Sequence, residues 1–173
     1  MDKTEHLSPI ALLASYEKMF HQRHEEKTVS EQHENSYLAF QCGAKKYLIK
    51  MSQVLEVVTE ISSVTPLPFA KKWLLGLINQ RGEIYSVVDF QSYIGDTFVP
   101  KGKKVENYVL LRDVGEGYIL KVNAVFGIRT CNIEDYQSSV EWIDGKAEVD
   151  NEEWLFINLN SLVTSNTFIQ SFR

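Results

Sequence analysis

The chain has 173 residues, of which 44% are hydrophobic and 24% are charged, and its formal net charge at pH 7 is −5. This composition is typical of a globular protein that fills one ordinary core or two small ones. The negative charge disfavours nucleic acid and anionic membrane as primary partners. No apolar run approaches the roughly 20 residues that cross a bilayer, and no secretory signal begins the chain, so we expect a cytoplasmic protein.

Residues 1–36 are expected to form a helix followed by a polar linker. Ser8 can cap the helix and Pro9 can occupy its first turn. Apolar residues then recur at helical spacing, at Leu12, Leu13, Tyr16, Met19 and Phe20. This stripe could cover the rest of the fold or dock on a partner, and the sequence leaves both open. All four histidines fall in this region without thiol or carboxylate partners at ligand spacing, so no metal site is predicted.

Short β-type runs begin at Tyr37. The first two surround Gly43 and predict a hairpin, and residues 53–58 predict a further strand that ends before Pro66. In residues 53–58, both faces of the expected strand carry apolar side chains. Apolar side chains therefore stay exposed whichever face is buried, and an exposed apolar strand edge can serve as a protein interface.

Residues 73–90 form the most apolar stretch, two β-prone runs joined by a polar apex at residues 79–83. Asn79 and Gly82 fit the first and fourth positions of a type I turn. Both arms are apolar enough to be buried on two sides, which leaves Arg81 exposed at the apex as a candidate contact for a partner. Asp89 follows and can cap a short helical turn that Gly95 closes.

The pattern then repeats. Tyr37 and its run match Tyr108 and its run, and Trp73 matches Trp142 at nearly the same separation along the chain. We therefore expect a mainly β chain with two modules of about five strands, packed face to face because each is small for an independent core. The expected first module spans about residues 45–100, and the second combines residues 37–44 with residues 104–165.

No pattern typical of an enzyme is found. The sequence lacks a nucleophile elbow, a P-loop and a dinucleotide-binding motif, and it has no histidine after residue 33. Cys42 and Cys131 are in no metal or redox spacing and are expected to be reduced. We therefore expect a non-enzymatic binding protein that uses no metal and no cofactor.

The stretch with Gly76, Asn79, Arg81, Gly82 and the Val87-Val88-Asp89 run resembles the signature of the CheW-like family of chemotaxis coupling proteins. The resemblance covers about residues 37–163, within a CheW-like domain expected at residues 37–173. It implies a pair of five-stranded, SH3-like barrels preceded by the N-terminal helix. It also implies non-enzymatic coupling of chemoreceptors (methyl-accepting proteins) to a CheA-type histidine kinase.

By position, the resemblance implies two contact surfaces. One would face the regulatory domain of the kinase, through Val54, Glu56 and Val57. The other would face the cytoplasmic tip of the receptor, through Asn79, Arg81, Gly82, Val125 and Ile128. The protein would then lie in the cytoplasm, at receptor arrays of the inner membrane.

The N-terminal region is most similar to PilI-type members of this family, which serve chemosensory systems that control twitching by type IV pili. One departure from the family is Asn123, which stands where the family usually carries aspartate. The competing hypothesis is a regulatory module that binds a small ligand between the two barrels.

Overall fold

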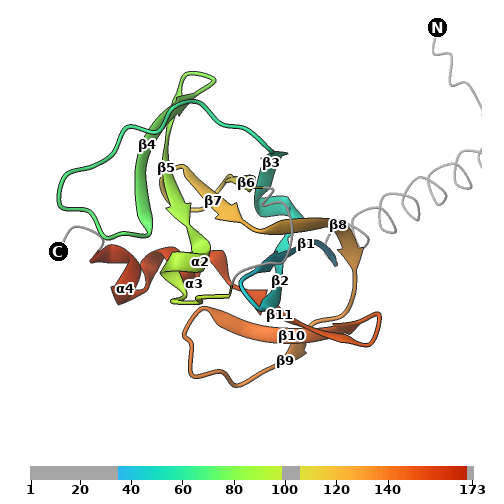
Figure 1. Cartoon of the computed structure of the whole chain (residues 1–173). Helices are drawn as coiled ribbons and strands as arrows, with labels where there is room; N and C mark the ends of the chain where they lie inside the picture. The colour runs from blue at the N-terminus through green and yellow to red at the C-terminus, as the bar shows by residue number, and fades with distance from the viewer. Residues whose placement is uncertain (1–34, 99–105, 171–173) are drawn as a thin grey trace, which may run out of the picture. The chain divides into compact units, whose positions relative to one another are not determined.

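A computed structural model describes residues 35–98 and 106–170. The expected N-terminal helix, its linker and the four histidines lie outside these residues. The described part is mainly β, as predicted (Figure 1). Its strands are β1 (Ser36–Cys42), β2 (Lys45–Lys50), β3 (Val54–Val58), β4 (Leu74–Gln80), β5 (Glu83–Asp89), β6 (Asn107–Leu111), β7 (Tyr118–Val122), β8 (Ala124–Thr130), β9 (Glu134–Asp135), β10 (Ile143–Val149) and β11 (Glu152–Ile157). Its short helices are η1 (Met51–Gln53), α2 (Phe90–Tyr93), α3 (Leu159–Thr164) and α4 (Asn166–Ile169).

The strands form two sheets with one shared plan. The five-stranded sheet has the order β3-β6-β7-β5-β4, and the six-stranded sheet has the order β8-β1-β2-β11-β10-β9. In chain order, strands β1 to β5 of the first repeat correspond to β6, β7, β8, β10 and β11 of the second repeat. With this correspondence, the two sheets have the same strand order, and the six-stranded sheet has β9 in addition. Each sheet also has one parallel pair at the matching place, β5 with β7 and β11 with β2. We call β3 to β7 the first module and the other strands the second module.

The two sequence repeats exchange their first hairpins. The first repeat runs from β1 to β5, but its hairpin β1–β2 joins the second module, and the hairpin β6–β7 of the second repeat joins the first module. The sheets therefore divide the strands differently from the barrel ranges expected from the sequence. Strand β2 lies in the second module rather than in a barrel at 45–100, and β6 and β7 lie in the first module rather than in the range 104–165.

Local detail follows the same repeat. The ladder β4–β5 shifts register just before Gly76, and β10–β11 shifts just before Gly145, the equivalent position of the second repeat. Each shift is a bulge that bends its strand. The turn helices match as well, since Asp89 Oδ1 accepts from Ser92 N at 3.0 Å and Asn158 Oδ1 accepts from Ser161 N at 3.1 Å. These matches confirm two similar β modules.

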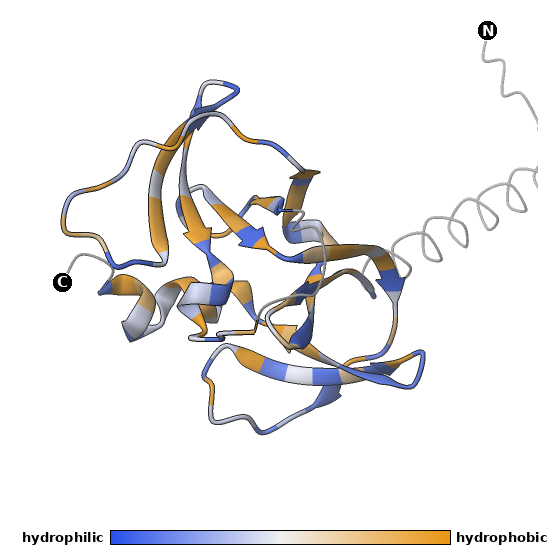
Figure 2. Cartoon of the chain, viewed as in Figure 1, coloured by the Kyte–Doolittle hydropathy of each residue, from blue (hydrophilic) through white to orange (hydrophobic). Residues whose placement is uncertain are grey.

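The core has three parts because successive strand residues point to opposite faces of a sheet. In β1, Leu38 and Phe40 face a large cluster shared by both sheets, while Tyr37 and Ala39 face a smaller cluster inside the second module. Strand β5 does the same in the first module, with Val88 in the shared cluster and Val87 in the module's own cluster. Figure 2 shows the apolar strands and the polar β4–β5 and β10–β11 turns. The modules therefore pack against each other through one sheet face each, as expected.

Two details of the central hairpin differ from expectation. Its loop is Arg81-Gly82 alone, with φ of 55° and 86°, whereas a type I turn requires negative φ at both positions. Positive φ at both residues is characteristic of a type I′ turn, whose twist matches that of paired strands. The arms are also less buried than expected, because Ile84 is 67% exposed beside this turn.

Candidate partner-binding surface

Strand β3, at the edge of the first module, presents the first candidate surface. A bulge opposite β6 leaves Leu55 unpaired, and its side chain is 44% exposed, next to Val57 at 37%. Glu56 is half-buried between them, whereas Val54 belongs to the shared core and is only 3% exposed. Of the three residues expected to face the kinase, Glu56 and Val57 are accessible, and Val54 supports the strand from inside.

The β4–β5 turn lies close to this strand. Asn79 Oδ1 accepts a hydrogen bond from Gly82 N at 3.1 Å, so this pair shapes the turn that carries Arg81. The side chain of Arg81 is 68% exposed, and its Nη2 lies 3.0 Å from Oε1 and 2.9 Å from Oε2 of Glu56. Only the contact with Oε1 has hydrogen-bond geometry, and Oε2 is buried without a hydrogen bond in the described structure. Arg81, which was expected to face the receptor, is therefore in direct contact with Glu56, which was expected to face the kinase.

Strand β8, at an edge of the second module, presents the equivalent surface. A bulge opposite β1 leaves Phe126 unpaired at the position that repeats Leu55, and Ile128 occupies the place of Val57. Phe126 is 38% exposed and Ile128 is 56% exposed, while Val125 is half-buried against the shared core. Lys46 Nζ covers the rings of Phe126 and Trp154, at 5.4 and 5.2 Å from their centroids.

The two bulged residues were missed as candidates by sequence reasoning. Leu55 and Phe126 stand out only when the register of the ladder is known, because an unpaired residue changes the face on which its neighbours lie. The signal that could have found them is the repeat, since Phe126 follows Leu55 at the same separation as Tyr108 follows Tyr37. With this addition, each module exposes an apolar pair on one edge strand: Leu55 with Val57, and Phe126 with Ile128.

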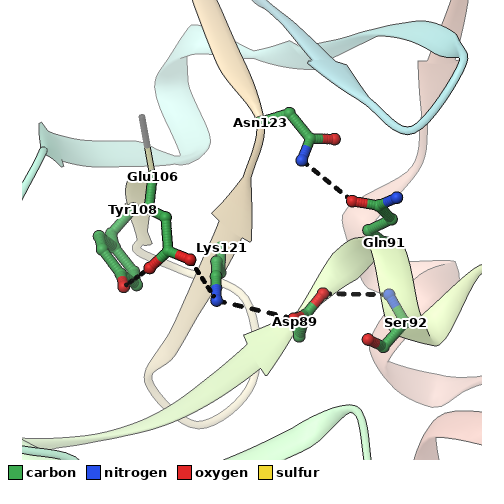
Figure 3. Close-up of polar contacts among 7 residues, drawn as sticks. All are labelled: Asp89, Gln91, Ser92, Glu106, Tyr108, Lys121 and Asn123. Atoms are coloured by element: carbon green, nitrogen blue, oxygen red, sulfur yellow. Dashed lines mark hydrogen bonds and ion pairs between the residues drawn. The ribbon is translucent and has the colours of Figure 1, made fainter. Parts of the chain in front are cut away.

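A polar network lies where β5 and β7 end and β6 begins (Figure 3). Lys121 Nζ is 2.9 Å from Glu106 Oε1 and 3.8 Å from Asp89 Oδ2. The Tyr108 hydroxyl donates to Glu106 Oε2 at 2.9 Å. Burial and the Glu106 carboxylate together raise the pKa of Tyr108 to about 12, so this phenol remains a donor at neutral pH. The network stabilises the end of the ladder that carries α2.

Asn123 lies between β7 and β8, where the chain passes from one module to the other. Its Oδ1 accepts from Gly43 N at 2.6 Å, and its Nδ2 donates to Gln91 Oε1 at 3.0 Å (Figure 3). It thereby joins the β1–β2 turn of the second module to α2, which follows β5 of the first module. An ionised aspartate can only accept hydrogen bonds, so asparagine fits both contacts better than an aspartate would.

Cys42 and Cys131 are free in the structure, and Cys42 is buried. Burial and the nearby charges of Asp89 and Asp96 raise the pKa of the Cys42 thiol to about 12, so its reactive thiolate is scarce at neutral pH. None of the helices in the described part of the chain is long and apolar enough to cross a bilayer.

The arrangement is that of a two-module β protein whose edge strands β3 and β8 expose apolar side chains to solvent. A model of the family described as the CheW-like domain matches residues 36–167, which is more than half of the chain. The chain belongs to the CheW-like family.

Relatives agree with this assignment. Protein PilI of Pseudomonas aeruginosa is 28% identical over 106 residues, covering 61% of this chain and 58% of PilI. Chemotaxis protein CheW of Rhizobium meliloti is 29% identical over 101 residues, covering 58% of this chain and 63% of that protein. The chain thus matches less than two thirds of the length of each of these curated relatives.

A solved structure has the same fold. The scaffolding protein TtCheW from Thermoanaerobacter tengcongensis superposes with a TM-score of 0.67 at 24% sequence identity. The match covers 77% of this chain and 94% of that one. The expected pair of packed β modules is therefore the fold of a known scaffolding protein.

Proposed function

We propose that the protein is a non-enzymatic adaptor that couples chemoreceptors to a CheA-type histidine kinase in a chemosensory array. The observation that carries this proposal is the repetition of one surface on two modules. Leu55 and Val57 on β3 have exposed counterparts in Phe126 and Ile128 on β8. Because these strands belong to different sheets, one chain can hold two partners at once.

The kinase regulatory domain is assigned to β3. Glu56 supplies a charge between the exposed side chains of Leu55 and Val57, and Val54 acts from beneath by supporting the strand. Apolar contacts flanked by a charge are the usual composition of a protein interface.

The receptor tip is assigned to the β4–β5 turn together with β8. Arg81 supplies the charge, Asn79 and Gly82 hold the turn, and Val125 with Ile128 supplies the apolar part. The similarity to PilI supports a role in twitching by type IV pili. The protein then acts in the cytoplasm, at receptor arrays of the inner membrane.

The test is capture of both partners by the full chain, using a receptor tip fragment and a kinase regulatory domain from the same cell. Val57→Asp is expected to reduce capture of the kinase and leave capture of the receptor. Ile128→Asp is expected to do the reverse, because each change places a charge in one apolar surface only.

Ile169→Asp is the matched control, since Ile169 is 64% exposed in α4, away from β3 and β8. Unchanged capture of both partners by Val57→Asp and Ile128→Asp, with all three variants folded by circular dichroism, would contradict the proposed surfaces.

A further inference from the structure

A pocket of about 270 Å³ lies between the two modules. The second module supplies Tyr47 from β2 and Trp142 with Ile143 at the start of β10, and the segment after β5 supplies Tyr93 and Ile94. This volume is just below the roughly 300–1,000 Å³ of sites for drug-sized ligands, so it suits a single small metabolite. Strand β5 starts at the Arg81 turn and ends at α2, so the pocket lies far from that turn.

Two polar side chains enter the pocket from one strand. Lys45 and Tyr47 are two residues apart in β2, and alternation places both on the same face. Tyr47 is only 2% exposed, but among the described residues the buried side-chain oxygen without a hydrogen bond is on Glu56, so the Tyr47 hydroxyl is not an orphaned group sealed in the core. Because Tyr47 lines the pocket, its hydroxyl can donate a hydrogen bond to a ligand held there.

The Tyr47 phenol is protonated in this setting. Burial, and then the nearby Cys42 and Asp96, raise its pKa well above the ordinary value. Its ring is fixed by packing on Phe40, with centroids 5.7 Å apart, and against Phe90 at 5.5 Å. The hydroxyl is therefore a positioned donor, and the ammonium of Lys45 on the rim adds a positive charge.

Asp96 adds the opposite charge to the same pocket. Its Oδ2 accepts from Ala44 N at 3.0 Å and its Oδ1 accepts from Phe98 N at 2.7 Å. These two backbone donors, helped by Lys45, lower the pKa of Asp96, so the carboxylate is charged at neutral pH. Each carboxylate oxygen can accept a second hydrogen bond. The pocket thus offers an acceptor that can receive a ligand's ammonium group.

We propose that this pocket binds a free α-amino acid with an apolar side chain. The α-carboxylate accepts from the Tyr47 hydroxyl and pairs with Lys45, and the α-ammonium donates to Asp96. The side chain of the ligand packs on Trp142, Ile94 and Ile143. Each polar group then meets its complement, and the apolar wall takes the rest of the molecule.

Such a ligand would contact both modules at once, because β2 belongs to one module and Asp96 follows β5 and α2 of the other. It would stabilise their mutual packing and raise the melting temperature with ligand concentration, since binding favours the folded state by mass action. The proposal does not depend on the adaptor role, because none of the residues assigned to kinase or receptor lines the pocket.

The test uses calorimetric titration of the full chain with L-phenylalanine. The two controls are 3-phenylpropionate, which lacks the ammonium, and phenethylamine, which lacks the carboxylate. L-Phenylalanine is expected to bind about tenfold or more tightly than either, the usual effect of losing a hydrogen bond to a charged group. Equal affinity for all three, or no binding of L-phenylalanine at millimolar concentration, would overturn the proposal.

Substitutions in β2 test which residues bind the ligand. Tyr47→Phe and Lys45→Gln are each expected to weaken binding of L-phenylalanine about tenfold while leaving the melting temperature of the free protein unchanged. Lys50→Gln is the matched control, because Lys50 is exposed on the same strand and does not line the pocket. Unweakened binding by both Tyr47→Phe and Lys45→Gln would place the ligand elsewhere and overturn the assignment.

Discussion

Arg81 and Glu56 form an ion pair between the two edges of the first module. Arg81 is in the turn that joins β4 to β5, and Glu56 is on β3, the strand at the other edge of the same sheet. The pair helps to close the sheet upon itself. With 68% of the Arg81 side chain exposed, it adds only about 0–1 kcal/mol to stability, so it can rearrange when a partner binds.

Arg81→Ala is expected to change the free energy of unfolding by less than about 1 kcal/mol and to weaken receptor binding by about 1–3 kcal/mol. Denaturant unfolding and titration with a receptor tip fragment measure the two effects. Lys71→Ala, which removes an exposed charge from the loop before β4, is the control. Receptor binding as tight as that of the unchanged protein would remove Arg81 from the site.

Asn123→Ala is expected to lower the free energy of unfolding by about 1–3 kcal/mol, because Gly43 N and Gln91 Oε1 both lose a partner. Asn123→Asp keeps an acceptor for Gly43 N and should cost less. Urea unfolding of both variants measures the difference. The ranking is wrong if aspartate proves as harmful as alanine.

Gly76→Ala is expected to destabilise the protein by at least about 2–3 kcal/mol, or to prevent folding. A Cβ at this position would lie 2.1 Å from the backbone oxygen of Thr65, and φ is 141°. Gly82→Ala is the matched control, because φ is 86° there but no atom lies within 4 Å of the added carbon. Only its backbone strain remains, about 1–2 kcal/mol. Thermal unfolding of the two variants should separate contact from strain, and equal losses would refute the role of Thr65.

Asp89→Ala and Asn158→Ala are expected to lower stability by similar amounts, about 0.5–2 kcal/mol each, because both remove the side chain that caps a helical turn. Denaturant unfolding of the single and double variants measures this. The sites lie in different modules, so the two losses should add. A strongly non-additive double variant would show that the caps act through a shared contact.

Asp96 is expected to make the free energy of unfolding depend on pH in the acidic range. Hydrogen bonds from Ala44 N and Phe98 N lower the pKa of Asp96 in the folded state. The ionised carboxylate therefore contributes fully to the free energy of unfolding at any pH above the pKa of an aspartate in the unfolded chain, which is about 4. This contribution is lost as the pH falls through the lowered folded pKa. Unfolding between pH 2 and pH 6 should therefore show a shallower loss of stability in Asp96→Asn than in the unchanged protein. Parallel pH profiles would exclude this contribution.

Patterns along the chain were sufficient for many features of the fold. The strands around Gly43 and the capped turn at Asp89 follow from residues close in sequence, and both are confirmed. The match of Trp73 with Trp142 follows from the repeat, and it is confirmed because Asp89 N donates to Trp73 O as Asn158 N donates to Trp142 O. Turn type was not predictable in the same way. Arg81 adopts φ of 55°, which an arginine seldom does, because the twist of the paired strands favours it.

The candidate site was only partly accessible from the sequence. Val57 and Ile128 were named as candidates through the resemblance to a family, and both are exposed, although their contact with a partner stays a prediction. Val54 was named with them but lies in the core, since its side chain points to the other face of β3 from Leu55. The contact of Glu56 with Arg81 joins residues 25 apart, and no local pattern reports it.

The sequence by itself determined that this chain has two similar β modules and belongs to the CheW-like family, because alternation, turn residues and the repeat can all be seen in the order of the residues. Only the tertiary structure decided which strands share a sheet, with the repeats exchanging the hairpins β1–β2 and β6–β7. The physical reason is that an apolar strand can satisfy its backbone hydrogen bonds with any strand of suitable register. The choice among partners depends on how all the side chains fill the shared core at once.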